Sequence, residues 1–316
     1  MTTVRWPEEF ESLRAEAREL AAALGSAMPQ DMREGDDASI VAEGRAFVAA
    51  AETTAATGRD EIVAGVPCRV FEPVDRDPIG TYVHFHGGAM VYGSPRLNDT
   101  ANEALSEQLG VRVISVDYRL APEHPHPAGL DDCVAVTRNV IDGGASPVVV
   151  GGESAGGYFA VQTLLRLRDQ GLADRVVAAN LAFGVYDLSG SPSFRGARAS
   201  SVPDVLHPGW IDLVLRLYAP GHSREDGRNP EVSPLFADLH GLPPALFTVG
   251  DADHLLDDSL FMAARWEAAG NGAELAVYPD CPHAFTMLPT ALASRANERI
   301  DAFLARAFRE ETLLAR

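Results

Sequence analysis

Residues 148–157 read VVVGGESAGG, and this stretch decides the fold. Three valines run directly into a Gly-x-Ser-x-Gly motif made by Gly152, Ser154 and Gly156, and a helical pattern follows. This order is typical of a nucleophile elbow, a sharp turn between a strand and a helix that exposes a serine hydroxyl. The glycines are needed because so tight a turn leaves no room for side chains beside the serine. A serine hydroxyl alone is a weak nucleophile, so the motif predicts chemistry only if a base and an oxyanion hole lie elsewhere in the chain.

A glycine-rich segment upstream is a candidate for the oxyanion hole. Residues 81–86 read as a strand, and the sequence GGA follows at 87–89. Backbone N–H groups of such a loop can point at the oxyanion of a tetrahedral intermediate, and the residue after the nucleophile supplies another. Alone, a His-Gly-Gly run is more often an ordinary turn, but the serine motif downstream favours the functional interpretation. The expected oxyanion hole consists of Gly87, Gly88, Ala89 and Ala155.

The base and the acid are expected later in the chain. Residues 244–250 and 274–278 are apolar, β-branched runs that read as strands, each followed by a loop with charged residues. In the second loop, His283 is expected to take the proton of Ser154 and return it to the leaving group. An aspartate after the first strand would hold the imidazole in the useful tautomer.

Four aspartates follow the first of these strands, and the residues alone leave the choice open: Asp251, Asp253, Asp257 and Asp258. Asp251 comes directly after a glycine, where a turn residue is common. Asp257 and Asp258 precede a helical pattern, where a helix cap and a first-turn acid are common.

Taken together, these motifs make the chain resemble the hormone-sensitive-lipase-like family of α/β-hydrolase carboxylesterases. The matching segments occur in the family's order from about residue 81 to the end of the chain. They read HGGA (86–89), DYRLAPEHP (117–125), GESAGG (152–157), SPL (233–235), LPP (242–244), DHLLD (253–257) and HAF (283–285). The resemblance implies a serine carboxylesterase with a helical cap, without a cofactor, and with the triad Ser154, Asp253 and His283.

Three positions depart from the pattern of that family. The third glycine of the oxyanion loop is Ala89, whose methyl restricts φ and is expected to narrow the acyl pocket. The proline after the triad aspartate is replaced by His254. The residue before the nucleophile is Glu153 rather than the commoner aspartate, and the sequence does not predict its role.

The expected activity is hydrolysis of short-to-medium acyl esters through an acyl-enzyme intermediate, with a small-molecule ester as the partner. An amidase, a carbamate hydrolase or a lactonase on the same triad is the alternative, since the sequence does not separate these reactions. A non-catalytic small-ligand receptor, as in the plant gibberellin receptors that resemble this family, is the alternative of another class. Such receptors have lost the catalytic histidine, whereas His283 is present here.

The alternation of apolar runs and helical patterns predicts an α/β-hydrolase fold, a mostly parallel central sheet flanked by helices, with a helical cap. Residues 62–71 are expected to add one antiparallel edge strand. The N-terminal cap helices are expected over 1–50, and the catalytic domain over 51–316, with a cap insertion at about 188–228. The expected substrate-pocket residues are apolar or aromatic and come mainly from the cap: Trp6, Phe10, Phe194, Trp210, Leu213, Leu217 and Tyr218.

The remaining histidines have structural interpretations. His84 alternates with its neighbours along one strand face, so packing is expected. His86 heads the oxyanion loop and is expected to shape it through hydrogen bonds rather than to act as a base. His124 and His126 lie in a proline-rich loop without a third ligand at zinc-site spacing, so no metal is expected.

Composition limits the other possibilities. The net charge of −19 over 316 residues, with arginine as the only basic residue besides histidine, argues against nucleic acid and anionic membranes as partners. No apolar run is long enough to cross a bilayer, so no membrane insertion is expected. The three cysteines show no pairing pattern, and no signal-peptide pattern opens the chain, which favours reduced thiols and a cytoplasmic location. From the resemblance alone, a homodimer through the last strand and the C-terminal helix is expected.

Overall fold

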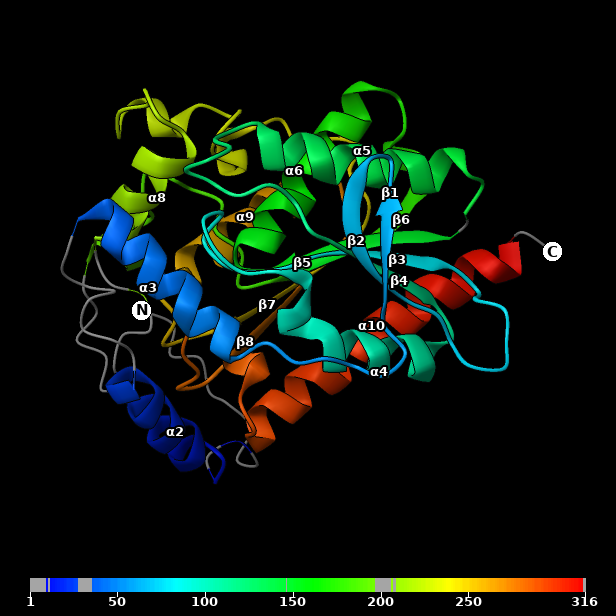
Figure 1. The fold of residues 1–316 in the computed structure, drawn as a ribbon, viewed down its shortest axis with the longest axis horizontal. Helices are drawn as coiled ribbons and strands as arrows, with labels where there is room; N and C mark the ends of the chain where they lie inside the picture. The colour runs from blue at the N-terminus through cyan, green and yellow to red at the C-terminus, as the bar shows by residue number, and fades with distance from the viewer. Residues whose placement is uncertain are drawn as a thin grey trace.

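An eight-stranded sheet forms the centre of the protein in the computed structural model, with strand order β1-β2-β4-β3-β5-β6-β7-β8 (Figure 1). The structure describes residues 10, 12–27, 36–145, 147–196, 206 and 209–314. The strands are β1 (Arg59–Val63), β2 (Val66–Phe71), β3 (Thr81–Phe85), β4 (Arg112–Val116), β5 (Val148–Glu153), β6 (Val176–Ala182), β7 (Ala245–Gly250) and β8 (Ala273–Tyr278). From β4 to β8 all pairings are parallel, whereas β1 and β2 are antiparallel to their neighbours. The predicted mostly parallel α/β sheet is confirmed.

The edge of the sheet differs from the prediction. Residues 62–71 were expected to form one strand, but the chain reverses at Ala64 and Gly65, so that β1 and β2 form a hairpin. Both turn residues have positive φ values, 51° and 84°. Tight hairpin turns of this kind need two left-handed residues, and alanine is not a typical one. Of the two turn residues, only Gly65 is therefore typical of a hairpin turn, so the sequence did not clearly indicate one here.

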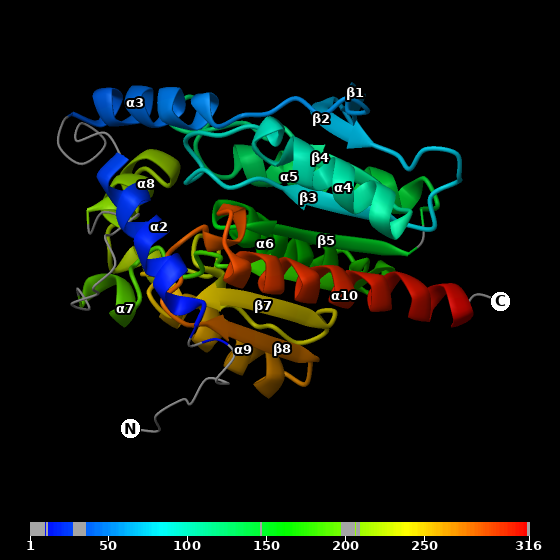
Figure 2. The same ribbon diagram turned by 90° about the horizontal axis from the view of Figure 1, so that it is seen from below.

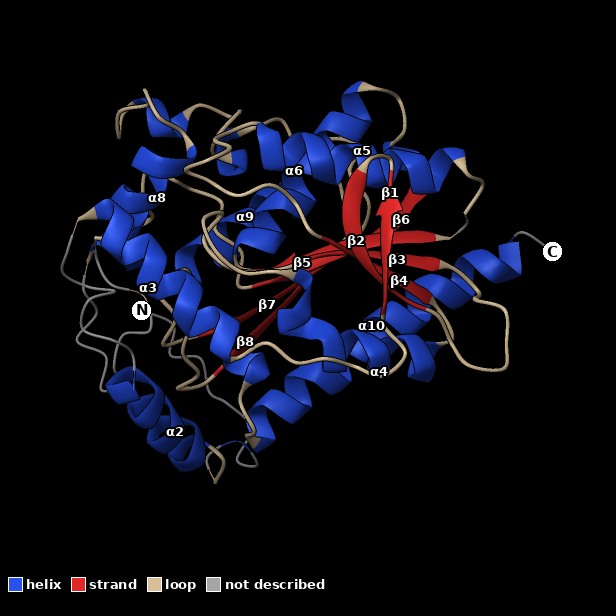
Figure 3. Ribbon diagram, viewed as in Figure 1, coloured by secondary structure: helices blue, strands red, loops and turns tan. Residues whose placement is uncertain are grey.

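Helices cover both faces of the sheet (Figures 2 and 3). α4 (Asp99–Leu109) and α10 (Ala291–Leu314) lie on one face. α5 (Ala128–Asp142), α6 (Ala155–Asp169) and α9 (Leu256–Ala268) lie on the other. Short 3-10 helices complete the connections: η2 (Pro95–Asn98), η3 (Ala173–Arg175), η4 (Asp226–Arg228), η5 (Pro234–Phe236) and η6 (Phe285–Met287).

The valines of β5 explain why its sequence is continuously apolar. Val148 and Val150 pack in the hydrophobic cluster that includes α5 and α6. Val149 points the other way, into the cluster that includes Leu304 of α10. All three valines are fully buried, because a central parallel strand has a helical layer on each side. This packing holds the carboxyl end of β5, and therefore Ser154, in a fixed position.

Further helices gather beyond one end of the sheet (Figures 1 and 2). They are α2 (Arg14–Ala27), α3 (Asp37–Ala50), α7 (Pro192–Arg195) and α8 (Trp210–Tyr218). The ring centroids of Phe194 in α7 and His254 are 5.7 Å apart, which places α7 beside the loop that follows β7. α8 lies within the segment 188–228, where the cap insertion is expected. The division into N-terminal cap helices, insertion and catalytic domain stays a prediction.

Two further observations concern cysteines and membrane spans. Cys68, Cys133 and Cys281 are unpaired and buried, which agrees with the expected reduced thiols. Across the described ranges, no helix combines the length and apolar character needed to cross a membrane.

Candidate active site

Ser154 lies in a sharp turn between β5 and α6. Its backbone is held at φ 56° and ψ −117°, a left-handed conformation that non-glycine residues rarely adopt. The flanking glycines make this turn possible. A Cβ atom at Gly152 would lie 2.1 Å from the carbonyl oxygen of Phe85, and one at Gly156 would lie 1.8 Å from the same oxygen. The strained serine and the glycines required beside it have the geometry of a nucleophile elbow.

His283 connects Ser154 to Asp253. Its Nε2 lies 2.9 Å from Oγ of Ser154, and its Nδ1 lies 2.9 Å from Oδ2 of Asp253. The other oxygen, Oδ1 of Asp253, accepts the N–H of Leu255 at 2.8 Å, which fixes the carboxylate. The Phe183 ring packs edge-on against the imidazole at 5.1 Å between centroids. The structure thus brings together the serine, histidine and aspartate expected from the sequence, in an arrangement that can transfer a proton.

The other three aspartates of the same segment accept backbone N–H groups. Oδ1 of Asp251 accepts the N–H of Asp280 at 2.7 Å. Oδ2 of Asp257 accepts the N–H of Ser193 at 2.7 Å. Asp258 is fully buried and accepts two N–H groups from the segment that enters the insertion. These three carboxylates therefore hold loops in place, whereas Asp253 is the one that contacts His283.

The oxyanion loop follows β3 and lies beside Ser154. A Cβ atom at Gly87 would lie 3.6 Å from Cβ of Ser154. The loop turns through residues with positive φ, 127° at Gly88 and 58° at Ala89. A Cβ atom at Gly88 would lie 2.0 Å from the carbonyl oxygen of Tyr92, so this position requires glycine. The backbone of the loop can therefore come close to a substrate carbonyl at Ser154.

One expected donor is engaged elsewhere. The N–H of Gly87 donates to Oε1 of Glu153 at 3.0 Å, which corrects the expectation that it faces the oxyanion. Within the described part of the chain, the N–H groups of Gly88, Ala89 and Ala155 have no hydrogen-bond acceptor. These three N–H groups are thus open donors near the nucleophile.

His86 shapes the loop as the sequence predicts. Its Nδ1 lies 2.7 Å from the carbonyl oxygen of Gly87, and its ring stacks on Tyr118 with 4.1 Å between centroids. The Tyr118 hydroxyl donates to the carbonyl oxygen of His86 at 2.6 Å. Burial lowers the pKa of His86 to about 4, so the ring is neutral at neutral pH. A neutral imidazole in this place braces the loop without adding charge to the site.

The structure separates the expected pocket residues into two groups. Phe194 and Trp210 lie together, with ring centroids 6.1 Å apart, and the Trp210 indole N–H donates to the Tyr92 hydroxyl at 3.3 Å. Tyr92 ends the oxyanion loop, and no motif in the sequence indicates its role. These aromatic side chains therefore lie close to the loops that carry the site.

The remaining expected pocket residues have other surroundings. Tyr218 is a core residue that packs edge-on against Tyr158 and Phe159 of α6. Leu213 is buried in α8, and Leu217 is partly buried against the core. Phe10 packs on Tyr278 at the end of β8, with 6.4 Å between ring centroids. Trp6 lies outside the described residues.

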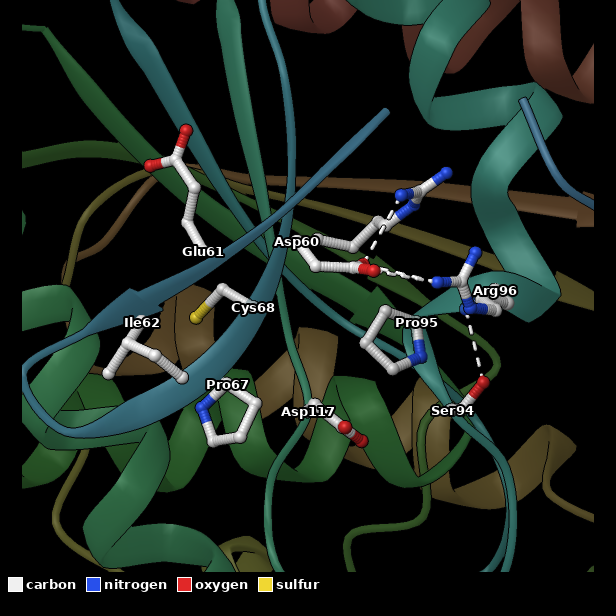
Figure 4. Close-up of a pocket in the computed structure, with 10 residues that line it drawn as sticks. Asp60, Glu61, Ile62, Pro67, Cys68, Ser94, Pro95, Arg96 and Asp117 are labelled. Atoms are coloured by element: carbon white, nitrogen blue, oxygen red, sulfur yellow. Dashed lines mark hydrogen bonds and ion pairs between the residues drawn. The ribbon is translucent and has the colours of Figure 1, made fainter. Parts of the chain in front are cut away.

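A cavity of about 280 Å³ lies elsewhere, between the β1–β2 hairpin and η2 (Figure 4). Its charged walls are largely paired. Asp60 lies 3.2 Å from Arg69 and 2.9 Å from Arg96, and Arg69 also pairs with the buried Asp99 at 2.8 Å. Neither the serine elbow nor the oxyanion loop lines this cavity. Its ion pairs tie the hairpin to η2 and α4, which is a structural role.

Metal ligation finds no support in the described ranges. There, no three His, Cys, Asp or Glu side chains are grouped so that they could hold a metal ion.

Comparison with known proteins agrees with this geometry. The family model described as alpha/beta hydrolase fold matches residues 82–287. The chain is 36% identical over 255 residues to carboxylesterase NlhH of Mycobacterium tuberculosis, covering 77% of this chain and 78% of that protein. It is 31% identical over 228 residues to an acetyl-hydrolase of Streptomyces hygroscopicus, covering 71% of this chain and 75% of that protein. A crystal structure of a hormone-sensitive lipase from a metagenome library superimposes with a TM-score of 0.78 at 28% identity, covering 93% of this chain and 98% of that one.

Proposed function

Since this chain belongs to the α/β-hydrolase family and is a carboxylic ester hydrolase of the hormone-sensitive-lipase type, we propose that Ser154, His283 and Asp253 carry out the reaction. The observation that supports this most directly is the position of His283, whose two ring nitrogens are each 2.9 Å from one of the other two side chains. This connected arrangement also argues against a ligand receptor, which needs no base beside the serine.

In the acylation step, Oγ of Ser154 attacks the ester carbonyl carbon while Nε2 of His283 takes the hydroxyl proton. A tetrahedral intermediate forms, and Asp253 stabilises the charged imidazolium through Nδ1–H. The bond to the alcohol oxygen then breaks, and Nε2 gives its proton to that oxygen. The products of this half are the free alcohol and an acyl ester on Ser154.

In the deacylation step, water replaces the alcohol. Nε2 of His283 takes a proton from the water as its oxygen attacks the acyl carbon. The second tetrahedral intermediate breaks the bond to Oγ of Ser154, and Nε2 returns the proton to that oxygen. The carboxylic acid leaves, and the enzyme is restored.

The oxyanion of both intermediates accepts hydrogen bonds from Gly88, Ala89 and Ala155. Two observations support these three donors. Their N–H groups have no acceptor within the described part of the chain, and the oxyanion loop lies close to Ser154. Removing a single such donor typically costs about 2.7–4 kcal/mol of transition-state stabilisation. The donors are backbone groups, so they are fixed before the substrate arrives.

The substrates are esters with short-to-medium acyl chains. Two observations support this size. Ala89 adds a methyl group to the oxyanion loop, and Trp210, which lies beside Phe194, donates to the hydroxyl of Tyr92 at the end of that loop. The similarity to an acetyl-hydrolase points in the same direction.

A series of p-nitrophenyl esters from acetate to palmitate tests the proposed function. We expect saturable hydrolysis with the highest kcat/KM at butyrate to octanoate, and loss of activity in Ser154→Ala. Ser294→Ala, which removes a hydroxyl in α10 that donates to the carbonyl oxygen of Thr290, is the matched control and should keep full activity. Activity that persists in Ser154→Ala would refute Ser154 as the nucleophile. A preference for palmitate would refute the proposed short-to-medium acyl chain.

The family resemblance also supports a homodimer through β8 and α10. β8 is an edge strand of the sheet, opposite to β1, and Leu275 on it is 40% exposed. Light scattering should give twice the mass of 33.7 kDa. A stable monomer at micromolar concentration would remove this proposal.

A further inference from the structure

The carboxylate of Glu153 lies between the nucleophile turn and the oxyanion loop. Glu153 ends β5 and directly precedes Ser154. Its Oε1 accepts the N–H of Gly87 at 3.0 Å, and its Oε2 lies 3.0 Å from Nε2 of His84. One side chain on the nucleophile strand therefore holds both the start of the oxyanion loop and a residue of the strand before it.

His84 is buried and is itself held on both sides. Its Nδ1 lies 2.8 Å from the Ser115 hydroxyl on β4 and 3.4 Å from the amide nitrogen of Asn102 on α4. The expectation that His84 only packs is thus incomplete, because both of its ring nitrogens have polar partners. His84 lies two residues before His86, so a fixed His84 ring gives Glu153 a rigid partner on the strand that leads into the loop.

The contact to Gly87 determines where the next peptide groups lie. Once the Gly87 N–H is bound, the backbone that follows is fixed from one end. At its other end the loop is held by hydrogen bonds from the N–H groups of Val91 and Tyr92 to the carbonyl oxygen of Gly88, at 3.1 and 2.9 Å. These hydrogen bonds at both ends of the loop fix the positions of the open N–H groups of Gly88 and Ala89.

The charge of Glu153 cannot itself stabilise the oxyanion. A negative carboxylate near a developing negative oxygen raises the energy of the transition state. Any benefit from Glu153 must therefore come from where it holds the loop.

We propose that Glu153, held by His84, is a positioning residue that fixes the oxyanion loop against Ser154. This inference rests on the proposed function, since it assumes that Gly88 and Ala89 donate to the oxyanion. Loss of the Glu153–His84 contact should lower kcat rather than raise KM, because the oxyanion develops only as the transition state forms.

The glutamine variant separates position from charge. Oε1 of a glutamine can still accept the Gly87 N–H, and its amide N–H can donate to Nε2 of His84. The imidazole then carries its proton on Nδ1 and donates to the Ser115 hydroxyl, a tautomer that the ring can adopt. Glu153→Gln should therefore keep both contacts, whereas Glu153→Ala loses both.

Kinetics with p-nitrophenyl butyrate test the proposal. We expect Glu153→Ala to lower kcat by about tenfold to a hundredfold, somewhat less than the loss of a whole donor, with KM within about twofold. Glu153→Gln should stay within about threefold of wild type. Glu103→Ala is the matched control, because that carboxylate also accepts a backbone N–H, from Thr57 at 2.8 Å, but lies away from the site.

Three outcomes would overturn the proposal: a kcat near wild type in a folded Glu153→Ala, equal losses in the alanine and glutamine variants, or a rise in KM alone. If Glu153→Ala does not fold, Glu153→Asp decides. Its side chain is one methylene shorter, so we expect it to lose at least one of the two contacts, and kcat should fall while KM holds. The proposed function fails separately, if wild type shows no hydrolysis or Ser154→Ala retains it.

Discussion

Oδ2 of Asp253 lies 2.9 Å from Nδ1 of His283, while Oδ1 of Asp251, two residues earlier in the chain, accepts the N–H of Asp280. Two carboxylates of one short segment thus serve two different purposes. Asp253 orients the base, and Asp251 shapes the loop that presents it.

Replacing these two aspartates should have unequal effects. Asp253→Asn is expected to lower kcat by about 10⁴-fold, because the amide stabilises the wrong imidazole tautomer. Asp251→Asn keeps an oxygen that can accept the Asp280 N–H, so its kcat should fall less than about tenfold. Steady-state kinetics with p-nitrophenyl butyrate measures both. A larger loss in Asp251→Asn would reverse the assignment.

Ala89→Gly should widen the range of acyl chains. Alanine at φ 58° is strained, and glycine removes both the strain and the methyl group that Ala89 adds to the oxyanion loop. We expect the ratio of kcat/KM for the octanoate over the acetate ester to rise by about tenfold, the usual effect of one methyl-sized change in a pocket. Ala64→Gly, also at positive φ but in the distant hairpin turn, is the control. An unchanged ratio would show that Ala89 does not limit the pocket.

Asp258 should make stability depend on pH. Burial raises the pKa of this carboxyl to about 7, although hydrogen bonds from Tyr186 and Asp187 favour the charged form. Between about pH 4 and 7 the folded state therefore holds a proton that the unfolded state has released, so stability falls as the pH rises through this window.

The variant Asp258→Asn tests this dependence, because its oxygen can still accept both N–H groups but cannot ionise. As the pH rises from 5 to 8, the Tm of the wild type should fall relative to the Tm of the variant by at least about 2 °C. The exposed Asp142→Asn is the control. A difference that does not change with pH would contradict a raised pKa.

Arg14 and Arg18 of α2 bind Asp280, in the loop that carries His283. Burial raises the pKa of Asp280, but hydrogen bonds from the two arginines outweigh it, and the pKa lies below its usual value. Changing both arginines to alanine should lower kcat by about two- to fivefold at low salt, since ion pairs that are partly open to solvent are weak. The difference from wild type should shrink at high salt.

The exposed Arg138→Ala, which breaks an ion pair to Asp142 within α5, is the control for that experiment. A kcat equal to wild type at low salt would show that α2 does not help to hold the histidine loop.

The nucleophile turn and the parallel sheet could be predicted because their signals are local. The valines of β5, the glycines around Ser154 and the loop after β8 each have a pattern that one strand or turn explains. The choice of Asp253 needed the family resemblance, because four carboxylates share the segment and only their spatial contacts distinguish them.

The contacts of Glu153 could not be predicted in the same way. Its partners Gly87 and His84 are 66 and 69 residues away in the chain and meet it only because β3 pairs with β5. Tyr218 was expected in the pocket for its aromatic character, but the amphipathic face of α8 points it at α6. Both cases depend on tertiary packing, which residue types alone do not specify.

The most direct test of the account is a rapid-mixing measurement of p-nitrophenol release from p-nitrophenyl acetate. If Ser154 forms an acyl-enzyme, a burst of up to one p-nitrophenol per protomer precedes the steady state wherever deacylation is the slower step. Intact-protein mass spectrometry of the quenched burst should show one added acetyl group, which peptide mapping places on Ser154. An acetyl group on another residue, or steady hydrolysis with no acetylated enzyme at any time point, would contradict the account.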